Sequence, residues 1–310
     1  FLEANETLLV ADYNNRLLEV SFDSARVRDV NGVETPGHVI ADLETNSDNS
    51  IVYLPLSERD LVAFDLDSLQ ELWRLETERG VWGNPMREGD ILYFASIDHH
   101  LYAVNANTGS LIWDLELSGG IASAPLIADD RMYVGTFDRN IFAVSTDGEI
   151  IGEPFETEDW VWNTPVLLDG VIYATDLSGY VYAISLVDGE FDLIWKVQAS
   201  EDGIRPSPIV TEDHVIVADR DGRIFWLRRE DGQPFLVEGE DGLEPLERQV
   251  DAEVLSDMIT IVWDDDIESS DDSEESTQRS DLLIVSTVNN SRVLVAFTLN
   301  DGARRWEYGR

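Results

Sequence analysis

The sequence of 310 residues contains no cysteine, four histidines and a single lysine, Lys196. The absence of cysteine excludes disulfides, thiolate catalysis and cysteine-ligated metals, and so few histidines argue against a zinc site. It does not fix the compartment, because secreted proteins without disulfides exist. Neither a Gly-x-Ser-x-Gly nucleophile elbow nor a glycine-rich phosphate loop opening a helix occurs. We therefore predict no catalytic residue, no metal site and no cofactor.

Positive charge is also scarce, because 21 basic residues against 63 acidic ones give a formal net charge of −42. Such a surface repels phosphate backbones and anionic membrane surfaces, so we expect no nucleic-acid partner and no direct membrane insertion. The acidity suits either a protein kept soluble in high salt or one that docks onto a basic partner. No apolar run reaches the length of a membrane span. With 43% hydrophobic residues, the chain has ample material for a packed core.

The chain repeats itself with a period of 40 residues. Four segments align without gaps, and in each an apolar strand is followed ten residues later by a second one. The first strands begin at Ile51, Ile91, Arg131 and Val171, and the second at Leu61, Leu101, Ile141 and Val181. A proline keeps the same spacing, at Pro85, Pro125 and Pro165. Three looser copies begin at Thr7, Val215 and Leu283, which makes seven pairs.

The paired strands predict β-hairpins. Their residues are β-branched and aromatic, and turn-formers such as Asn14–Asn15 and Ser178–Gly179 separate them. An outer and an inner segment complete each repeat, giving four strands per 40 residues, the size of one propeller blade. We predict an all-β fold, a single β-propeller domain over residues 1–310 with seven blades, or eight if part of the ring lies outside this chain. Phe1–Ala4 is interpreted as the tail of a first inner strand.

The stretch from Ala103 to Trp113 contains an alanine, an asparagine, a Thr-Gly turn and a tryptophan. It resembles the tryptophan-docking motif of the PQQ-like (quinoprotein-type) β-propeller repeats, in which these residues recur once per blade. Four tryptophans stand at the same place in their repeats, and the resemblance implies a structural docking role for them: Trp73, Trp113, Trp195 and Trp306. Repeat four departs from the pattern, with Gly152 where the tryptophan should be, and repeats one and six lack it as well.

The resemblance implies one of two functional classes. The first is the PQQ-dependent alcohol and sugar dehydrogenases, in which adjacent cysteines commonly pack on the quinone and acidic and amide side chains hold a calcium. The second is the non-enzymatic propellers, such as the lipoprotein of the outer-membrane β-barrel assembly machinery. Because this chain has no cysteine and is much shorter than those dehydrogenases, the resemblance favours the non-enzymatic branch.

The loops that feed the inner strands carry the candidate binding residues. In the aligned repeats, one loop position holds Trp82, Ala122, Trp162 and Arg205. This position varies between repeats, whereas the core positions of a regular repeat have no need to vary. Tryptophan and arginine are typical of binding surfaces. We predict a partner- or ligand-binding site made of Trp82, Trp160, Trp162 and Arg205. The alternative is that the tryptophans plug the channel as packing.

Two further motifs are interpreted as non-functional. Residues 264–281 form a low-complexity acidic loop inserted in the last blade, without the glycine and the final glutamate of an EF-hand. We expect a solvated segment there rather than a calcium site. His99 and His100 share one tight turn and would point apart, which is poor geometry for a metal.

Together these features predict a non-enzymatic extracytoplasmic propeller that acts as a scaffold or assembly module. Its expected partners are proteins in a membrane-associated envelope or surface complex. The chain opens at Phe1 without methionine, which leaves room for a removed signal or an anchor upstream. Two alternatives stay open: a quinone-dependent dehydrogenase or a degenerate relative, and a ligand-sensing ectodomain of a longer protein.

Overall fold

The computed structural model describes residues 7–12, 14–23, 26–239, 242–262, 280–289 and 292–309. In these ranges the chain is built from strands β1 to β29 and contains no helix, and so no helix there could cross a membrane. The residues fall into two compact units, Phe1–Glu156 and Thr157–Arg310, which are described one at a time. The expectation of a single domain over residues 1–310 stays a prediction.

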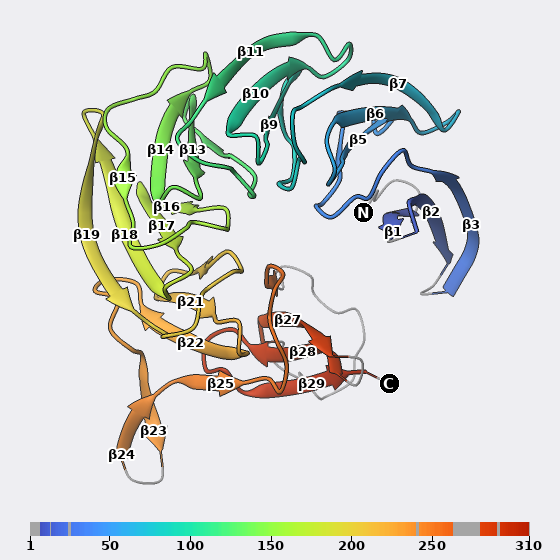
Figure 1. The fold of residues 1–310 in the computed structure, drawn as a ribbon. Helices are drawn as coiled ribbons and strands as arrows, with labels where there is room; N and C mark the ends of the chain where they lie inside the picture. Colours follow the sequence, from blue (N-terminus) through green and yellow to red (C-terminus); the bar gives the residue numbers. More distant parts are fainter. Residues whose placement is uncertain are drawn as a thin grey trace, which may run out of the picture. The chain divides into compact units, whose positions relative to one another are not determined.

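The first unit contains four antiparallel sheets in which the strands follow one another in sequence order (Figure 1). The first sheet has three strands in the described residues, β1 (Thr7–Asp12), β2 (Arg16–Asp23) and β3 (Arg26–Glu34). The second consists of β4 (Glu44–Thr45), β5 (Ile51–Pro55), β6 (Leu61–Asp65) and β7 (Gln70–Leu75). The third consists of β8 (Met86–Glu88), β9 (Ile91–Ala95), β10 (His100–Asn105) and β11 (Leu111–Glu116). The fourth consists of β12 (Leu126–Ala128), β13 (Arg131–Gly135), β14 (Asn140–Ser145) and β15 (Phe155–Glu156).

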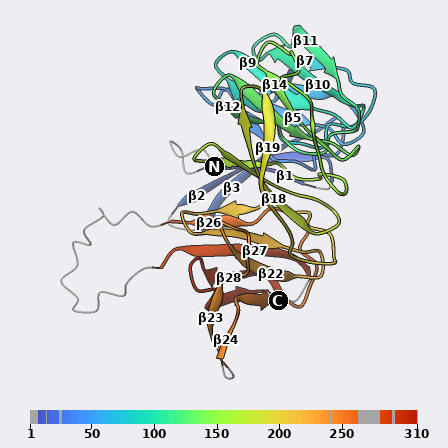
Figure 2. The same ribbon diagram turned by 90° about the vertical axis from the view of Figure 1, so that its left-hand side faces the viewer.

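The second unit contains three four-stranded sheets and a separate hairpin. The first sheet consists of β16 (Val166–Leu168), β17 (Val171–Thr175), β18 (Tyr180–Val187) and β19 (Glu190–Gln198). The next consists of β20 (Ile209–Val210), β21 (His214–Ala218), β22 (Arg223–Arg228) and β25 (Glu247–Gln249). The last consists of β26 (Ile259–Ile261), β27 (Leu282–Asn289), β28 (Arg292–Thr298) and β29 (Arg304–Tyr308). The hairpin of β23 (Leu236–Gly239) and β24 (Gly242–Pro245) is an insertion between β22 and β25 that projects from its sheet (Figure 2).

The predicted fold class is confirmed: the described part of the chain is an all-β propeller fold with seven blades. Each predicted strand pair is an antiparallel hairpin, namely β1–β2, β5–β6, β9–β10, β13–β14, β17–β18, β21–β22 and β27–β28. Six of the sheets have four strands in the described residues. The interpretation of Phe1–Ala4 as an inner strand lies outside the described residues, as does most of the predicted acidic loop at 264–281.

Neighbouring sheets within a unit bury both of their faces against one another. Strand β5 shows this, because its side chains alternate between two core clusters. Val52 and Leu54 pack with Leu17 of the first blade, whereas Tyr53 packs with Leu92 of the third. A single hairpin could not bury both faces, so stacking of blades is what makes these apolar strands stable.

Candidate functional site

Tryptophans on the outer strands of three blades join each of these blades to the next one in the same unit. Each indole N–H donates to a backbone carbonyl of the following blade, in the pairs Trp73–Ala106 (3.0 Å), Trp113–Thr146 (3.0 Å) and Trp195–Arg229 (2.9 Å). Each ring also lies on a glycine with positive φ in that blade, at Gly109, Gly148 and Gly232 respectively. These contacts make the tryptophans part of the frame that holds the loops in place.

One junction uses a tryptophan that the sequence analysis missed. Trp226 lies on the hairpin strand β22 opposite Ile216, a position that is alanine in β6, β10, β14 and β18. It is fully buried and donates to the carbonyl of Leu299 at 2.8 Å. Trp306 on β29 is 41% exposed, and its docking role stays a prediction.

The loops ahead of the inner strands share one local design. A fully buried aliphatic residue precedes each of the compared positions: Val81, Ile121, Val161 and Ile204. In three cases its backbone N–H donates to the preceding blade, from Val81 to Leu56 (3.0 Å), from Ile121 to Ser96 (3.2 Å) and from Ile204 to Asp176 (3.1 Å). The backbone is therefore fixed, while the side chain that follows is free to differ from blade to blade. The same position holds Ile40 in the second blade, a 47% exposed residue that the sequence comparison did not include.

Trp82 occupies this position in the loop before β8. It is half-buried, and its indole N–H donates to the carbonyl of Ser57 at 3.0 Å. The ring also lies against Gly80, where an added Cβ would stand 2.6 Å from the indole nitrogen. The side chain is thus held in one orientation by its own blade and the preceding one.

The second unit holds the other three predicted residues. Trp160 and Trp162 lie on the loop before β16, and Arg205 lies on the loop before β20, a strand next to β16. The guanidinium carbon of Arg205 stands 4.0 Å from the ring centroid of Trp162, a cation–π contact. Trp160 is 46% exposed and stands where three other blades have a glycine, at Gly80, Gly120 and Gly203. The structure therefore brings two predicted residues, Trp162 and Arg205, into direct contact.

The charge of Arg205 is not matched by a carboxylate in the described part of the chain. Its Nε atom is buried and has no hydrogen-bond partner. Burial, together with the nearby charge of Arg220, holds the pKa of Arg205 below its usual value. Arg220 belongs to the turn between β21 and β22, and its backbone N–H donates to the carbonyl of Gly203 at 3.0 Å. The result is a local positive site on a chain of strongly negative charge.

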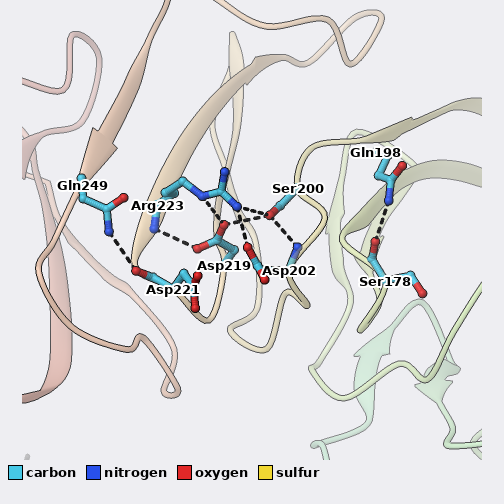
Figure 3. A network of polar contacts seen from close by, with 8 residues as sticks. All are labelled: Ser178, Gln198, Ser200, Asp202, Asp219, Asp221, Arg223 and Gln249. Atoms are coloured by element: carbon cyan, nitrogen blue, oxygen red, sulfur yellow. Dashed lines mark hydrogen bonds and ion pairs between the residues drawn. The ribbon is translucent and has the colours of Figure 1, made fainter.

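Arg223, in the same blade, shows the opposite arrangement (Figure 3). Its guanidinium contacts Asp219 at 2.9 Å and Asp202 at 2.6 Å, and it also donates to the Ser200 hydroxyl at 3.1 Å. Asp219 is fully buried and additionally accepts the Ser200 O–H at 2.8 Å. These partners satisfy Arg223 and fix the turn, so Arg223 is a structural residue rather than a candidate for binding.

His100 and His214 lie among the other polar features of the described ranges. No group of three histidine, aspartate or glutamate side chains there is placed to hold a metal ion. His100 lies 3.2 Å from Asp114 and stacks on Tyr102. A groove of about 670 Å³ in the second unit is lined by His214 and Phe235, among others. His214 is buried without a partner for either ring nitrogen, and this burial lowers its pKa.

Comparisons with known proteins agree with this architecture. The profile of a family described as outer membrane protein assembly factor BamB matches residues 57–163 and 153–310. The crystal structure of BamB from Moraxella catarrhalis superposes with a TM-score of 0.70 at 15% identity, over 95% of this chain and 80% of that chain. The computationally designed Ika8 protein superposes with a TM-score of 0.72 at 10% identity, over 98% of this chain and 85% of that chain. The comparison with curated protein sequences found no match.

At these identities the two structures show the fold alone. The family profile is more specific, because it matches well over half of the chain in two overlapping segments. It also confirms the PQQ-like repeat resemblance predicted from the docking motif around Trp113. The chain belongs to the PQQ-like repeat family of the outer membrane protein assembly factor BamB.

Proposed function

We propose that this chain is a non-enzymatic, extracytoplasmic propeller that binds a protein partner and holds it in an envelope assembly. Family membership supports the scaffold part of the proposal, because the family is described as an outer membrane protein assembly factor. The relative from Moraxella catarrhalis bears the same name. A rigid frame of repeats with variable loops suits this task, because the loops can change without loss of the frame.

The observation that carries the proposal is the aromatic and arginine group on two neighbouring loops of the second unit. Trp160 is 46% exposed, and Arg205 lies against Trp162 at 4.0 Å. Tryptophan and arginine contribute most of the binding energy at many protein interfaces. The proposed surface comprises these three residues of the second unit, and Trp82, at the corresponding loop position in the first unit, is a separate candidate for binding.

The binding proposal is tested by capture from native envelopes. Tagged protein is mixed with solubilised envelopes of the source organism, and bound proteins are quantified by mass spectrometry. We expect the wild type to retain a defined partner and the double variant W82A/W162A to lose it. Y308A is the matched control, because Tyr308 is an exposed aromatic residue on β29, outside the loops. Equal capture by all three proteins, each with an unchanged circular dichroism spectrum, would contradict the proposal.

The non-enzymatic and extracytoplasmic parts have tests of their own. Purified protein is mixed with PQQ and calcium and assayed for tight binding and for dye reduction with alcohols and sugars. We expect neither, and quinone-dependent dye reduction would establish the dehydrogenase alternative instead. Fractionation of cells that carry the full gene is expected to place the protein outside the cytoplasm.

A further inference from the structure

The side chain of Arg205 lacks the partners that a half-buried guanidinium normally has. Its Nε is enclosed by protein but donates to no acceptor, and the contact that the side chain makes is the stack on Trp162. A buried donor without an acceptor costs free energy, so such an atom calls for an explanation. Other arginines differ: Arg74 pairs with Asp60 and Glu71, and Arg223 pairs with Asp219 and Asp202.

The electrostatic surroundings of Arg205 are positive. The one charged group that shifts its pKa is Arg220, a second guanidinium, and no carboxylate offsets the repulsion. In the described ranges neither arginine has a carboxylate within ion-pair distance. This placement stands out because the chain has 63 acidic residues available to neutralise its 21 basic ones.

Further unsatisfied polar atoms lie on the same two loops. Asn163, next to Trp162, donates to the Thr175 hydroxyl at 2.6 Å, but its side-chain oxygen has no partner. Ser207, two residues after Arg205, has a buried hydroxyl without a partner. The loops run side by side into β16 and β20. Of these two atoms, only the Ser207 hydroxyl could donate to an anion, because the Asn163 side-chain oxygen is an acceptor.

We propose that Arg205 and Arg220 bind a carboxylate of the protein partner, an aspartate or glutamate side chain or a chain terminus, whose apolar neighbour packs on Trp160. This inference rests on the proposed function and specifies its chemistry. A planar guanidinium offers a carboxylate two parallel N–H donors, and the Trp162 ring holds that fork in one plane. The partner's carboxylate supplies the counter-ion that the described part of this chain does not provide to the two arginines.

Arginine side-chain NMR tests the proposal directly on the whole chain. The Nε–H signals of ¹⁵N-labelled protein are recorded, and the Arg205 signal is assigned with R205K. The probes are acetyl-Ser-Phe-Glu-Phe-Ser-amide, its Gln counterpart and inorganic phosphate, all at one ionic strength. We expect the Glu peptide to shift the Arg205 signal saturably and the Gln peptide to bind about tenfold more weakly or worse, because a charge-assisted pair is lost.

Variants locate the site. R205K is expected to weaken binding of the Glu peptide about tenfold, because lysine has neither the fork nor the stack. R220Q is expected to weaken it as well. R228K is the matched control, since Arg228 is an exposed arginine of the same unit that pairs with Asp231, and it should bind like the wild type. All variants should keep the wild-type melting temperature.

Three results would overturn the proposal. Equal binding of the Glu and Gln peptides would identify an apolar site without anion recognition. Phosphate binding as tight as that of the Glu peptide would assign the site to free anions rather than to a partner's carboxylate. Glu-peptide binding unchanged in R205K would place the carboxylate elsewhere. Because capture from envelopes is measured separately, a positive capture with failed peptides would refute only this carboxylate site.

Discussion

Gly109 offers a test of the contact that joins the second and third blades. Its φ is +68°, a conformation that costs other residues free energy, and an added Cβ would stand 2.6 Å from ring carbons of Trp73. The ring cannot move away easily, because its N–H is bonded to Ala106 and the side chain is almost fully buried. Gly89 is the matched control: its φ is +58°, yet an added Cβ there would have no neighbour within 4 Å.

The two alanine variants separate backbone strain from steric conflict. The left-handed conformation costs about 1–2 kcal/mol for a residue with a Cβ, and both variants incur this cost. Forcing a methyl group into a packed contact adds about 1–3 kcal/mol, which applies to G109A alone. We therefore expect G89A to lose about 1–2 kcal/mol of unfolding free energy and G109A about 2–5 kcal/mol.

Urea unfolding followed by far-UV circular dichroism measures both losses. The second unit supplies an independent pair, because Gly232 would place a Cβ 2.5 Å from Trp195 whereas Gly170 has open space. If both members of a pair unfold at the same urea concentration, the tryptophan does not lie on the glycine and the docking argument fails.

Three more predictions follow from the described contacts. W226F should lose about 1–3 kcal/mol of unfolding free energy, because the Leu299 carbonyl loses its donor and a small cavity is left; an unchanged urea midpoint would contradict the contact. The pKa of buried His214 is lowered, so as the pH falls the imidazole is protonated in the unfolded chain before it is protonated in the folded one. The unfolding free energy of the wild type should therefore decrease below about pH 6.5, by up to about 1.4 kcal/mol per pH unit. H214L should lack that part of the slope, and identical pH profiles would refute the assignment. Because the net charge is −42, adding sodium chloride from about 0.01 M to about 1 M should raise the melting temperature as the Debye length falls from about 30 to about 3 Å; a constant melting temperature would count against charge repulsion.

The hairpins could be predicted because their physics is local. Alternating apolar residues and turn-formers at a fixed spacing define β5–β6 and its equivalents without knowledge of distant contacts. The docking role of Trp226 could not be predicted from this local pattern. In this blade the docking tryptophan lies on the hairpin strand, where other blades have alanine, instead of on the outer strand. The β23–β24 insertion interrupts the period just there, so the repeat could not be followed through this blade.

The candidate binding residues could be selected from the sequence, whereas their contacts could not, and their role in binding stays a prediction. Comparison of repeats singled out Trp162 and Arg205, because they differ at a position where regular blades should agree. That they touch, and that Arg220 rather than a carboxylate lies near them, depends on how two blades pack. Such contacts join loops far apart in sequence and leave no periodic signal.

In each of these loops a buried residue fixes the backbone and the residue after it varies between blades. Substitution of the variable residue should therefore leave the fold unchanged. Val81 and Ile204 are buried completely, and their N–H groups are bonded to the preceding blade, so they set the path of the backbone. The next residue is Trp82 in one case and Arg205 in the other, although the backbone bonds are the same. The same backbone therefore accepts an indole or a guanidinium at this position. We expect substitutions there to leave the fold unchanged, because the buried neighbour sets the backbone path, and the role of these side chains in recognition stays a prediction.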